Sequence, residues 1–198
     1  MYVNIPCQNV AVENTGEVWH KEQAERIGEA VAARRKALGM TGQQLAARCA
    51  DLGVPIHRTT ITKIEKGRPR FDLGELIVLA AALNTSPVLL MYPGPFGRSV
   101  GILPGRSVTD IDAVQWFSAL QWFAAVAAPT DDVSTARREW RAAAAEVVKW
   151  RHLQDLAMSR AAWIAKDPHR RDPETVESIA FYDKMIRDVQ QQLGVDDG

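Results

Sequence analysis

The sequence predicts an all-α protein built from two helical parts, and three observations support this prediction. Apolar residues recur at steps of three and four throughout the chain, as they do on the buried face of an α-helix. Residues that start and stop helices flank these segments. Residues 92–108 hold three prolines and four glycines among seventeen residues, a density that predicts a linker. We therefore expect five helices before this linker and a helical bundle or hairpin after it.

The predicted organisation of the chain follows from these patterns. Residues 1–19 show no apolar periodicity and contain no Lys or Arg, which predicts a flexible N-terminal arm. We predict a compact domain over 20–92, a Pro/Gly linker over 93–108 and a helical domain over 109–194. Residues 195–198 form an acidic tail.

The first predicted helix begins at Lys21 and ends at Leu38, before Gly39. Its inner stripe consists of Ala24, Ile27, Val31 and Leu38. Arg34, Arg35 and Lys36 lie near its carboxyl end, where the helix dipole favours positive charge. These side chains are either solvated or contact a phosphate backbone, and the sequence leaves both interpretations open.

Residues 41–67 predict two helices joined by a turn. Thr41 and Gln44 have the spacing of a capping box at the start of the first helix. Gly53 and Pro55 interrupt the pattern, and a second helix begins near His57 or Arg58 and stops at Gly67. On this second helix Ile61 and Ile64 point inward, which leaves outside Arg58, Thr59, Thr60, Thr62 and Lys63. Such side chains near a helix amino terminus can bind base edges and phosphates, so the second helix is predicted to read DNA.

This segment resembles the Xre family of helix-turn-helix repressors, the Cro and lambda-repressor type. The resemblance rests on LGM-T-x-x-QLA at 38–46 followed by ITKIEKG at 61–67, and it covers about 22–91. It implies a five-helix DNA-binding domain over 20–92 whose third helix enters the DNA. Two departures are present: Gly42 stands where the family usually carries a phosphate-binding Gln, and the turn between the two helices is longer than usual.

The resemblance also implies which residues contact DNA. Base reading falls to the outward side chains of the second motif helix, Arg58, Thr59, Thr60, Thr62 and Lys63. Contacts to the DNA backbone are expected from Arg34, Arg35, Thr41, Gln43, Gln44, Lys66, Arg68 and Arg70. The short basic loop Arg68-Pro69-Arg70 stands where family members approach the sugar-phosphate backbone.

The remaining helices are predicted from their caps and stripes. Asp72 with Glu75 predicts a capping box for a fourth helix, and Ser86 with Pro87 predicts a fifth that ends near Met91. In the C-terminal part we predict helices over 110–127, 134–166 and 173–193. The long middle helix carries an apolar stripe of Ala136, Trp140, Ala143, Val147, Trp150, Ala157, Ala161 and Ile164.

The tryptophans of this part are Trp116, Trp122, Trp140, Trp150 and Trp163. We interpret them as core anchors or a subunit interface, with a stacking platform for bases or a ligand as the alternative.

The net charge is zero, but the charges are segregated. Residues 20–70 carry +6, 71–132 carry −4, 133–171 carry +5 and 172–198 carry −5. The first basic block coincides with the predicted DNA-reading motif, which favours nucleic-acid binding. For the second block, either the acidic last helix folds back on it or it lies against phosphates; the opposite charges favour the first arrangement.

Several classes of site and of protein are not expected. The four histidines show no metal-ligand spacing, and no catalytic motif or phosphate-binding glycine loop is present, so we predict neither an enzyme nor a cofactor. Cys7 and Cys49 do not predict a disulfide framework, and Cys49 is expected to be buried. No signal pattern or membrane span is evident, which predicts a cytoplasmic, nucleoid-associated protein.

Together these features predict a sequence-specific transcriptional repressor that binds a double-stranded operator, with a homodimer formed through the C-terminal helices. The layout also resembles actinobacterial and actinophage regulators, which would make an immunity repressor of a temperate phage one identity. Two alternatives stay open: an autoregulating antitoxin whose C-terminal helices bind a toxin, and a ligand-sensing regulator whose tryptophans line a pocket.

Overall fold

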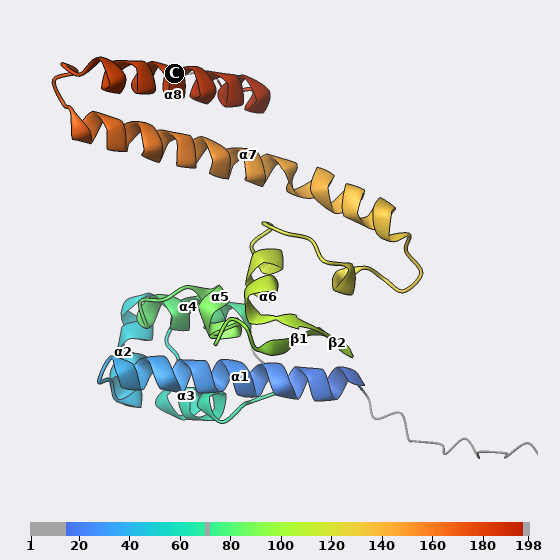
Figure 1. The fold of residues 1–198 in the computed structure, drawn as a ribbon. Coiled ribbons are helices and arrows are strands. Elements are labelled where there is room, and N and C mark those ends of the chain that lie inside the picture. The colour runs from blue at the N-terminus through green and yellow to red at the C-terminus, as the bar shows by residue number, and fades with distance from the viewer. Residues whose placement is uncertain (1–14, 70–71, 196–198) are drawn as a thin grey trace, which may run out of the picture. The chain divides into compact units, whose positions relative to one another are not determined.

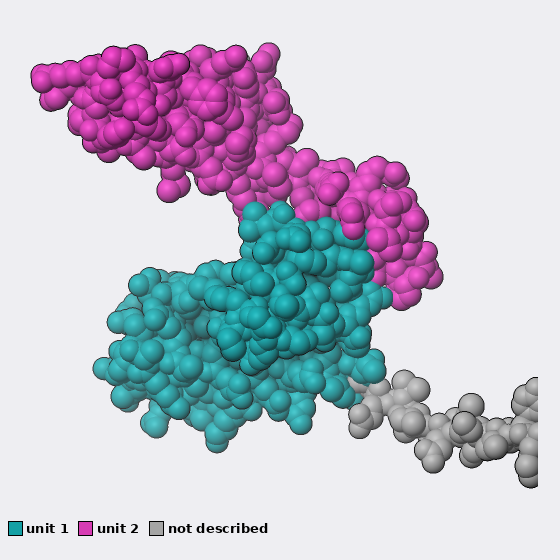
Figure 2. Space-filling model, in the orientation of Figure 1, with its two compact units in different colours: residues 1–126 teal, residues 127–198 magenta. Residues whose placement is uncertain are grey.

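The computed structural model describes residues 15–69 and 72–195, and these residues are mostly helical (Figure 1). The chain divides into two compact units between Val126 and Ala127 (Figure 2). This boundary lies beyond the linker predicted at 93–108, because that segment folds with the first unit. The arm predicted at 1–19 and the tail predicted at 195–198 fall largely outside the described residues.

The first unit contains the five predicted helices. They are α1 (Thr15–Ala37), α2 (Gly42–Asp51), α3 (Arg58–Glu65), α4 (Leu73–Ala82) and α5 (Pro87–Met91). Their apolar faces meet in one core, which includes Val31, Leu45, Cys49, Ile61, Ile64, Leu79 and Leu83. The prediction that Cys49 is buried is therefore confirmed. Leu38 was expected in the core but is 37% exposed, because α1 ends before it at Ala37.

Both predicted capping boxes form. The backbone nitrogen of Gln44 donates to Thr41 Oγ1 at 3.2 Å, and that of Thr41 donates to Gln44 Oε1 at 2.8 Å. Asp72 and Glu75 make the same reciprocal pair at the start of α4. Each box satisfies backbone donors that a helix start leaves unpaired, which fixes where α2 and α4 begin.

Helices α1 and α3 approach each other closely at Gly28. A Cβ placed on Gly28 would lie 2.2 Å from the carbonyl oxygen of Ile64, a separation that no side chain can occupy. Glycine is thus required here by backbone contact, and this contact holds the carboxyl end of α3 against α1.

The segment predicted as a linker contains a β-hairpin that the helical patterns did not predict. Strands β1 (Ser99–Leu103) and β2 (Arg106–Thr109) pair antiparallel, with Val100 opposite Val108. Val100 and Ile102 pack in a second core with Tyr92 and Ala113. Trp19 Nε1 donates to the Gly101 carbonyl at 3.2 Å, and α1 begins at Thr15, six residues earlier than predicted.

The helix predicted over 110–127 is much shorter. Helix α6 (Asp110–Phe117) ends in a turn that Ala119 enters with a left-handed φ of 56°. The nitrogens of Ala119 and Leu120 then donate to the carbonyls of Trp116 and Gln115, which satisfies the end of the helix. Only the 3-10 turn η1 (Ala124–Val126) follows, so the second QWF repeat is not helical.

The second unit is a helical hairpin of α7 (Val133–Lys166) and α8 (Pro173–Leu193). Arg160 Nε lies 2.5 Å from Asp183 Oδ1, and Lys149 Nζ lies 3.4 Å from the carbonyl oxygen of Gln192. The acidic last helix therefore folds back along the basic one, as the opposite charges predicted. Asp172 caps α8 through its hydrogen bonds from Thr175, which hold the pKa of the Asp172 carboxyl below its usual value.

Two kinds of feature are absent from the part of the chain that the structure describes. No helix there combines the length and apolar character needed to cross a lipid bilayer. No group of three or more His, Cys, Asp or Glu side chains there is placed to hold a metal ion.

Candidate DNA-binding surface

Helix α3 is seated by its apolar side, which leaves the opposite side exposed. Ile61 and Ile64 are each 1% exposed and pack into the core formed with α1, α2 and α4. His57 is the N-cap residue, and Gly67 takes the left-handed conformation after the helix with a φ of 77°. The sequence thus placed both ends of this helix correctly, and the core fixes which of its faces is free.

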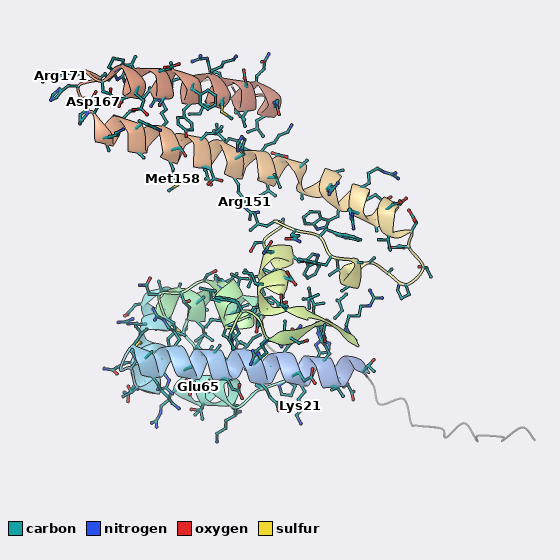
Figure 3. The ribbon with its side chains drawn as sticks, in the orientation of Figure 1. Lys21, Glu65, Arg151, Met158, Asp167 and Arg171 are labelled. Carbon is teal, nitrogen blue, oxygen red and sulfur yellow. The ribbon has the colours of Figure 1, made fainter. Side chains whose placement is uncertain are left out.

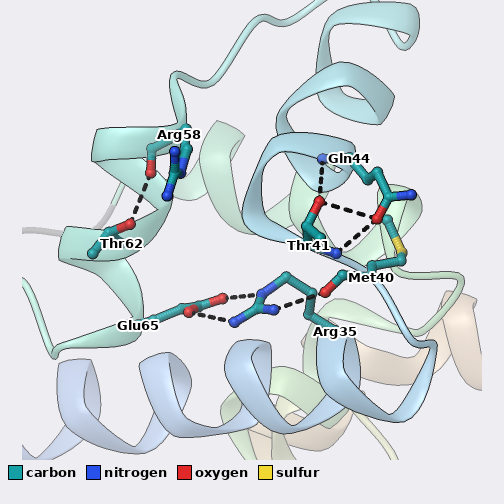
Figure 4. A network of polar contacts seen from close by, with 7 residues as sticks. All are labelled: Arg35, Met40, Thr41, Gln44, Arg58, Thr62 and Glu65. Carbon is teal, nitrogen blue, oxygen red and sulfur yellow. Dashed lines mark hydrogen bonds and ion pairs between the residues drawn. The ribbon is translucent and has the colours of Figure 1, made fainter.

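Four of the five predicted base-reading side chains lie on that exposed face. They are Arg58, Thr59, Thr62 and Lys63, whereas Thr60 is only partly exposed. The Thr62 hydroxyl donates to the Arg58 carbonyl at 3.0 Å (Figure 4). Because that donor is used within the helix, Thr62 offers an outside partner its methyl group and a hydroxyl lone pair.

The amino ends of α2 and α3 lie next to each other. A Cβ placed on Gly42, the first residue of α2, would be 3.8 Å from Cγ of Arg58, the first residue of α3. Unpaired backbone N–H groups and the positive ends of two helix dipoles therefore meet at one place. Such an arrangement favours an anion, and a DNA phosphate is one.

Three of the predicted backbone contacts stand at the start of α2. Thr41 and Gln44 use their side-chain oxygen atoms in the capping box, so the side-chain nitrogen Nε2 of Gln44 is the group left to donate outward. Gln43 is exposed. Gly42 occupies the position where the family usually carries a phosphate-binding Gln, and Gln43 or Gln44 lies close enough to take that role.

Arg34 and Arg35, which were predicted to contact the DNA backbone, both make hydrogen bonds within the protein. Arg34 Nε donates to the Leu83 carbonyl, and its Nη2 donates to the Asn84 carbonyl, both at 3.1 Å. Arg35 forms a two-bond pair with Glu65, at 2.6 and 2.8 Å, and also donates to the Met40 carbonyl at 2.8 Å (Figure 4). Hydrogen bonding to Glu65 raises the pKa of the Arg35 guanidinium.

These contacts belong to a wider pattern in which arginines bind the carboxyl ends of helices. Arg48 Nη1 donates to the Ala82 carbonyl at 3.2 Å, beside the two carbonyls that Arg34 reaches after α4. Arg26 Nε donates to the Met91 carbonyl, the last residue of α5, at 2.7 Å. Three arginines of the first basic block, Arg26, Arg34 and Arg48, therefore satisfy carbonyls at helix ends.

The remaining predicted backbone contacts follow α3. Lys66 is exposed at the carboxyl end of the helix. Arg68 pairs with Glu75, which completes the capping box of α4 with Asp72, and so ties the loop to that helix. Arg70 lies outside the described residues.

Replacing Arg35 is expected to lower stability without changing the salt dependence of DNA binding. The side chains of Arg35 and Glu65 are 14% and 16% exposed, so Arg35→Ala would leave a nearly buried carboxylate unpaired. We expect a loss of about 3 kcal/mol in the free energy of unfolding, measured with urea. Lys36→Ala, the exposed neighbour, should change it by less than about 0.5 kcal/mol. A stable Arg35→Ala protein with a reduced salt slope would make Arg35 a phosphate contact instead.

Residues 31–90 match the model of the helix-turn-helix family, from the last two turns of α1 to Leu90 in α5. Residues 31–90 form a helix-turn-helix domain. The match confirms the predicted resemblance for this part of the chain, which is under a third of its length. No curated protein and no solved structure matches the chain.

A helix-turn-helix domain of this kind implies sequence-specific DNA binding. The comparisons identify no catalytic family, and they give no support to a phage immunity repressor. The geometry adds two points that the sequence pattern missed. His57 is exposed at the start of α3, next to Arg58. The close contact between α1 and α3 at Gly28 was also not predicted, although a glycine on the apolar face of a helix is the kind of residue that allows one.

Proposed function

We propose that the protein is a transcriptional repressor that binds a specific double-stranded DNA operator as a homodimer. The observation that carries the proposal is the exposed polar face of α3, which begins beside the amino end of α2. On this proposal α3 lies in the major groove, with Arg58, Thr59, Thr62 and Lys63 facing base edges. Thr60 stands at the edge of this set.

The proposed DNA-backbone contacts flank α3 on both sides. On one side are Thr41, Gln43 and Gln44 at the start of α2, where two helix amino ends favour a phosphate. On the other side is Lys66, at the carboxyl end of α3. Arg34 and Arg35 are left out of this set, because their guanidinium groups bind groups of the protein.

We assign the repressor role on the length of DNA that the proposed homodimer would cover. Two domains in a homodimer would cover two half-sites about one helical turn apart, or a multiple of that distance. A protein bound across a promoter in this way blocks access by polymerase without needing a further activity.

The proposal is tested by selecting duplexes from a random pool with the full chain, then measuring affinity by fluorescence anisotropy. One enriched motif bound at least a thousandfold more tightly than random duplex is expected. A promoter carrying that motif should lose transcription when the protein is added. Failure to enrich any sequence, or equal affinity for enriched and random duplexes, would overturn the proposal.

The contact at Lys66 gives a separate prediction. Lys66→Ala should weaken enriched and random duplexes alike and reduce the slope of log affinity against log salt by about 0.9, the value for one lost phosphate contact. Lys21→Ala is the matched control, because Lys21 is an exposed lysine near the start of α1. An unchanged slope for Lys66→Ala would place this lysine away from the phosphates.

A further inference from the structure

Helix α8 packs against one side of α7 and does not extend along residues 133–146 of α7. Lys149 lies level with Gln192, near the end of α8, and Arg160 lies level with Asp183. Because the two helices run antiparallel, residues 133–146 of α7 extend past Leu193, the last residue of α8. Leu156, at 6% exposure, is buried on the side that α8 covers.

The apolar stripe predicted for α7 faces away from α8. Of its members, Val147 is 39% exposed and Trp150 is 41% exposed, and Met158 beside the stripe is 72% exposed. Figure 3 shows Met158 and Arg151 on the side of α7 opposite α8. Helix α8 therefore packs against a different face of α7, and this stripe is not covered by α8.

The exposed stripe has the seven-residue repeat of a coiled coil. One position of the repeat holds Val133, Trp140, Val147, Gln154 and Ala161. The other holds Ala136, Ala143, Trp150 and Ala157. Steps of three and four alternate over four repeats, a length at which this pattern predicts pairing of helices. Gln154 is the one polar side chain in the stripe, and a single polar core residue commonly fixes the register of two identical helices.

The charges on either side of the stripe differ in sign. Glu139 and Glu146, seven residues apart, lie on one flank, and both are exposed. Arg151 lies on the other flank and is partly exposed. In a parallel pair the two opposite flanks meet, and Glu146 of each copy faces Arg151 of the other. In an antiparallel pair like flanks would meet, and like charges would repel.

We propose that α7 pairs with α7 of a second copy as a parallel coiled coil over residues 133–161. The occupant of the stripe is a second copy, because the repeat of one helix and the complementary charges on its two flanks satisfy each other. This inference rests on the proposed function in one respect: it takes two copies bound to one operator to be joined through their C-terminal units. It deepens that function by naming the surface that joins the copies.

The oligomeric state is measured by sedimentation velocity of the full chain without DNA. A dimer is expected at micromolar concentration. Val147→Glu should raise the dimer dissociation constant at least tenfold, because it places a charge in the paired stripe. Val148→Glu should change it less than twofold. Val148 is 44% exposed, much like Val147, but it lies off the stripe. Circular dichroism checks that both variants stay helical.

The direction of pairing is measured by cysteine cross-linking in a Cys7→Ser background. Ala136→Cys and Ala157→Cys, one near each end of the coiled coil, should each form a disulfide between copies under mild oxidation. A parallel pair brings both positions next to themselves, whereas an antiparallel pair can do so for at most one. Glu146→Lys should weaken the dimer, and adding Arg151→Glu should restore it.

Several outcomes would overturn the inference: a monomer at tens of micromolar, equal effects of Val147→Glu and Val148→Glu, or cross-linking at only one of the two cysteines. A chain that is monomeric alone and pairs only with an unrelated protein would overturn it as well. A parallel dimer that binds no duplex would uphold this inference and refute the proposed function. A monomer that binds its operator would refute this inference together with the homodimer of the proposed function, and would leave sequence-specific DNA binding intact.

Discussion

Gly28→Ala is expected to lower the free energy of unfolding by about 3 kcal/mol or more. The added Cβ would lie 2.2 Å from the Ile64 carbonyl oxygen and 3.2 Å from backbone atoms of Glu65. These are backbone atoms of α3, so no flexible side chain can move aside and the helices themselves must separate. Urea unfolding of the full chain, followed by circular dichroism, measures the loss.

Gly42→Ala is the matched control for this substitution. Gly42 also lies in a helix, but a Cβ added there would make only an ordinary contact, 3.8 Å from Arg58 Cγ. Replacing a helical glycine by alanine should then leave stability unchanged or raise it by about 0.5–1 kcal/mol. Similar losses at the two glycines would show that the contact between α1 and α3 does not set the stability of the domain.

Arg58→Ala is expected to cost about 1–3 kcal/mol of binding free energy on the enriched duplex, which is roughly 5- to 150-fold in affinity. On random duplex the loss should be much smaller. The physical reason is that Arg58 opens α3 on its exposed face, where a guanidinium can bind both acceptors of a guanine. Fluorescence anisotropy on both duplexes at one salt concentration gives the two numbers.

Arg58→Lys separates base reading from simple charge. Lysine keeps the positive charge but cannot form the two parallel bonds of arginine, so random duplex should be bound as before while the preference for the enriched site falls. If Arg58→Ala weakened both duplexes equally and Arg58→Lys restored both, Arg58 would be a phosphate contact.

The parts of the fold that could be predicted were those fixed by neighbours in sequence. Thr41 with Gln44 and Asp72 with Glu75 lie three residues apart, and both capping boxes form as expected. Ile61 and Ile64 likewise share one face whatever they pack against. The ends of α3 and the exposure of Arg58, Thr59, Thr62 and Lys63 follow from such short-range rules, whereas their contact with bases stays a prediction.

The structural features that could not be predicted from the sequence depend on contacts between residues far apart in the chain. Arg34 binds carbonyls 49 and 50 residues away, and no charge count can distinguish that role from a phosphate contact. The hairpin was missed because Val100 and Ile102 alternate over too few residues, among glycines and prolines that usually mark loops. The stripe on α7 was recognised as a pattern, but periodicity alone does not say which of two apolar faces α8 covers.

The restraints on α3 have a consequence for the DNA. Its carboxyl end is held against α1 by the contact at Gly28 and by the pair between Arg35 and Glu65. A helix fixed in this way cannot tilt to follow a groove of a different width. The duplex must then adjust, and the energy of that adjustment depends on base steps that the protein does not touch. We therefore expect DNA sites with identical contacted bases to differ in affinity according to how easily the uncontacted base steps next to them deform.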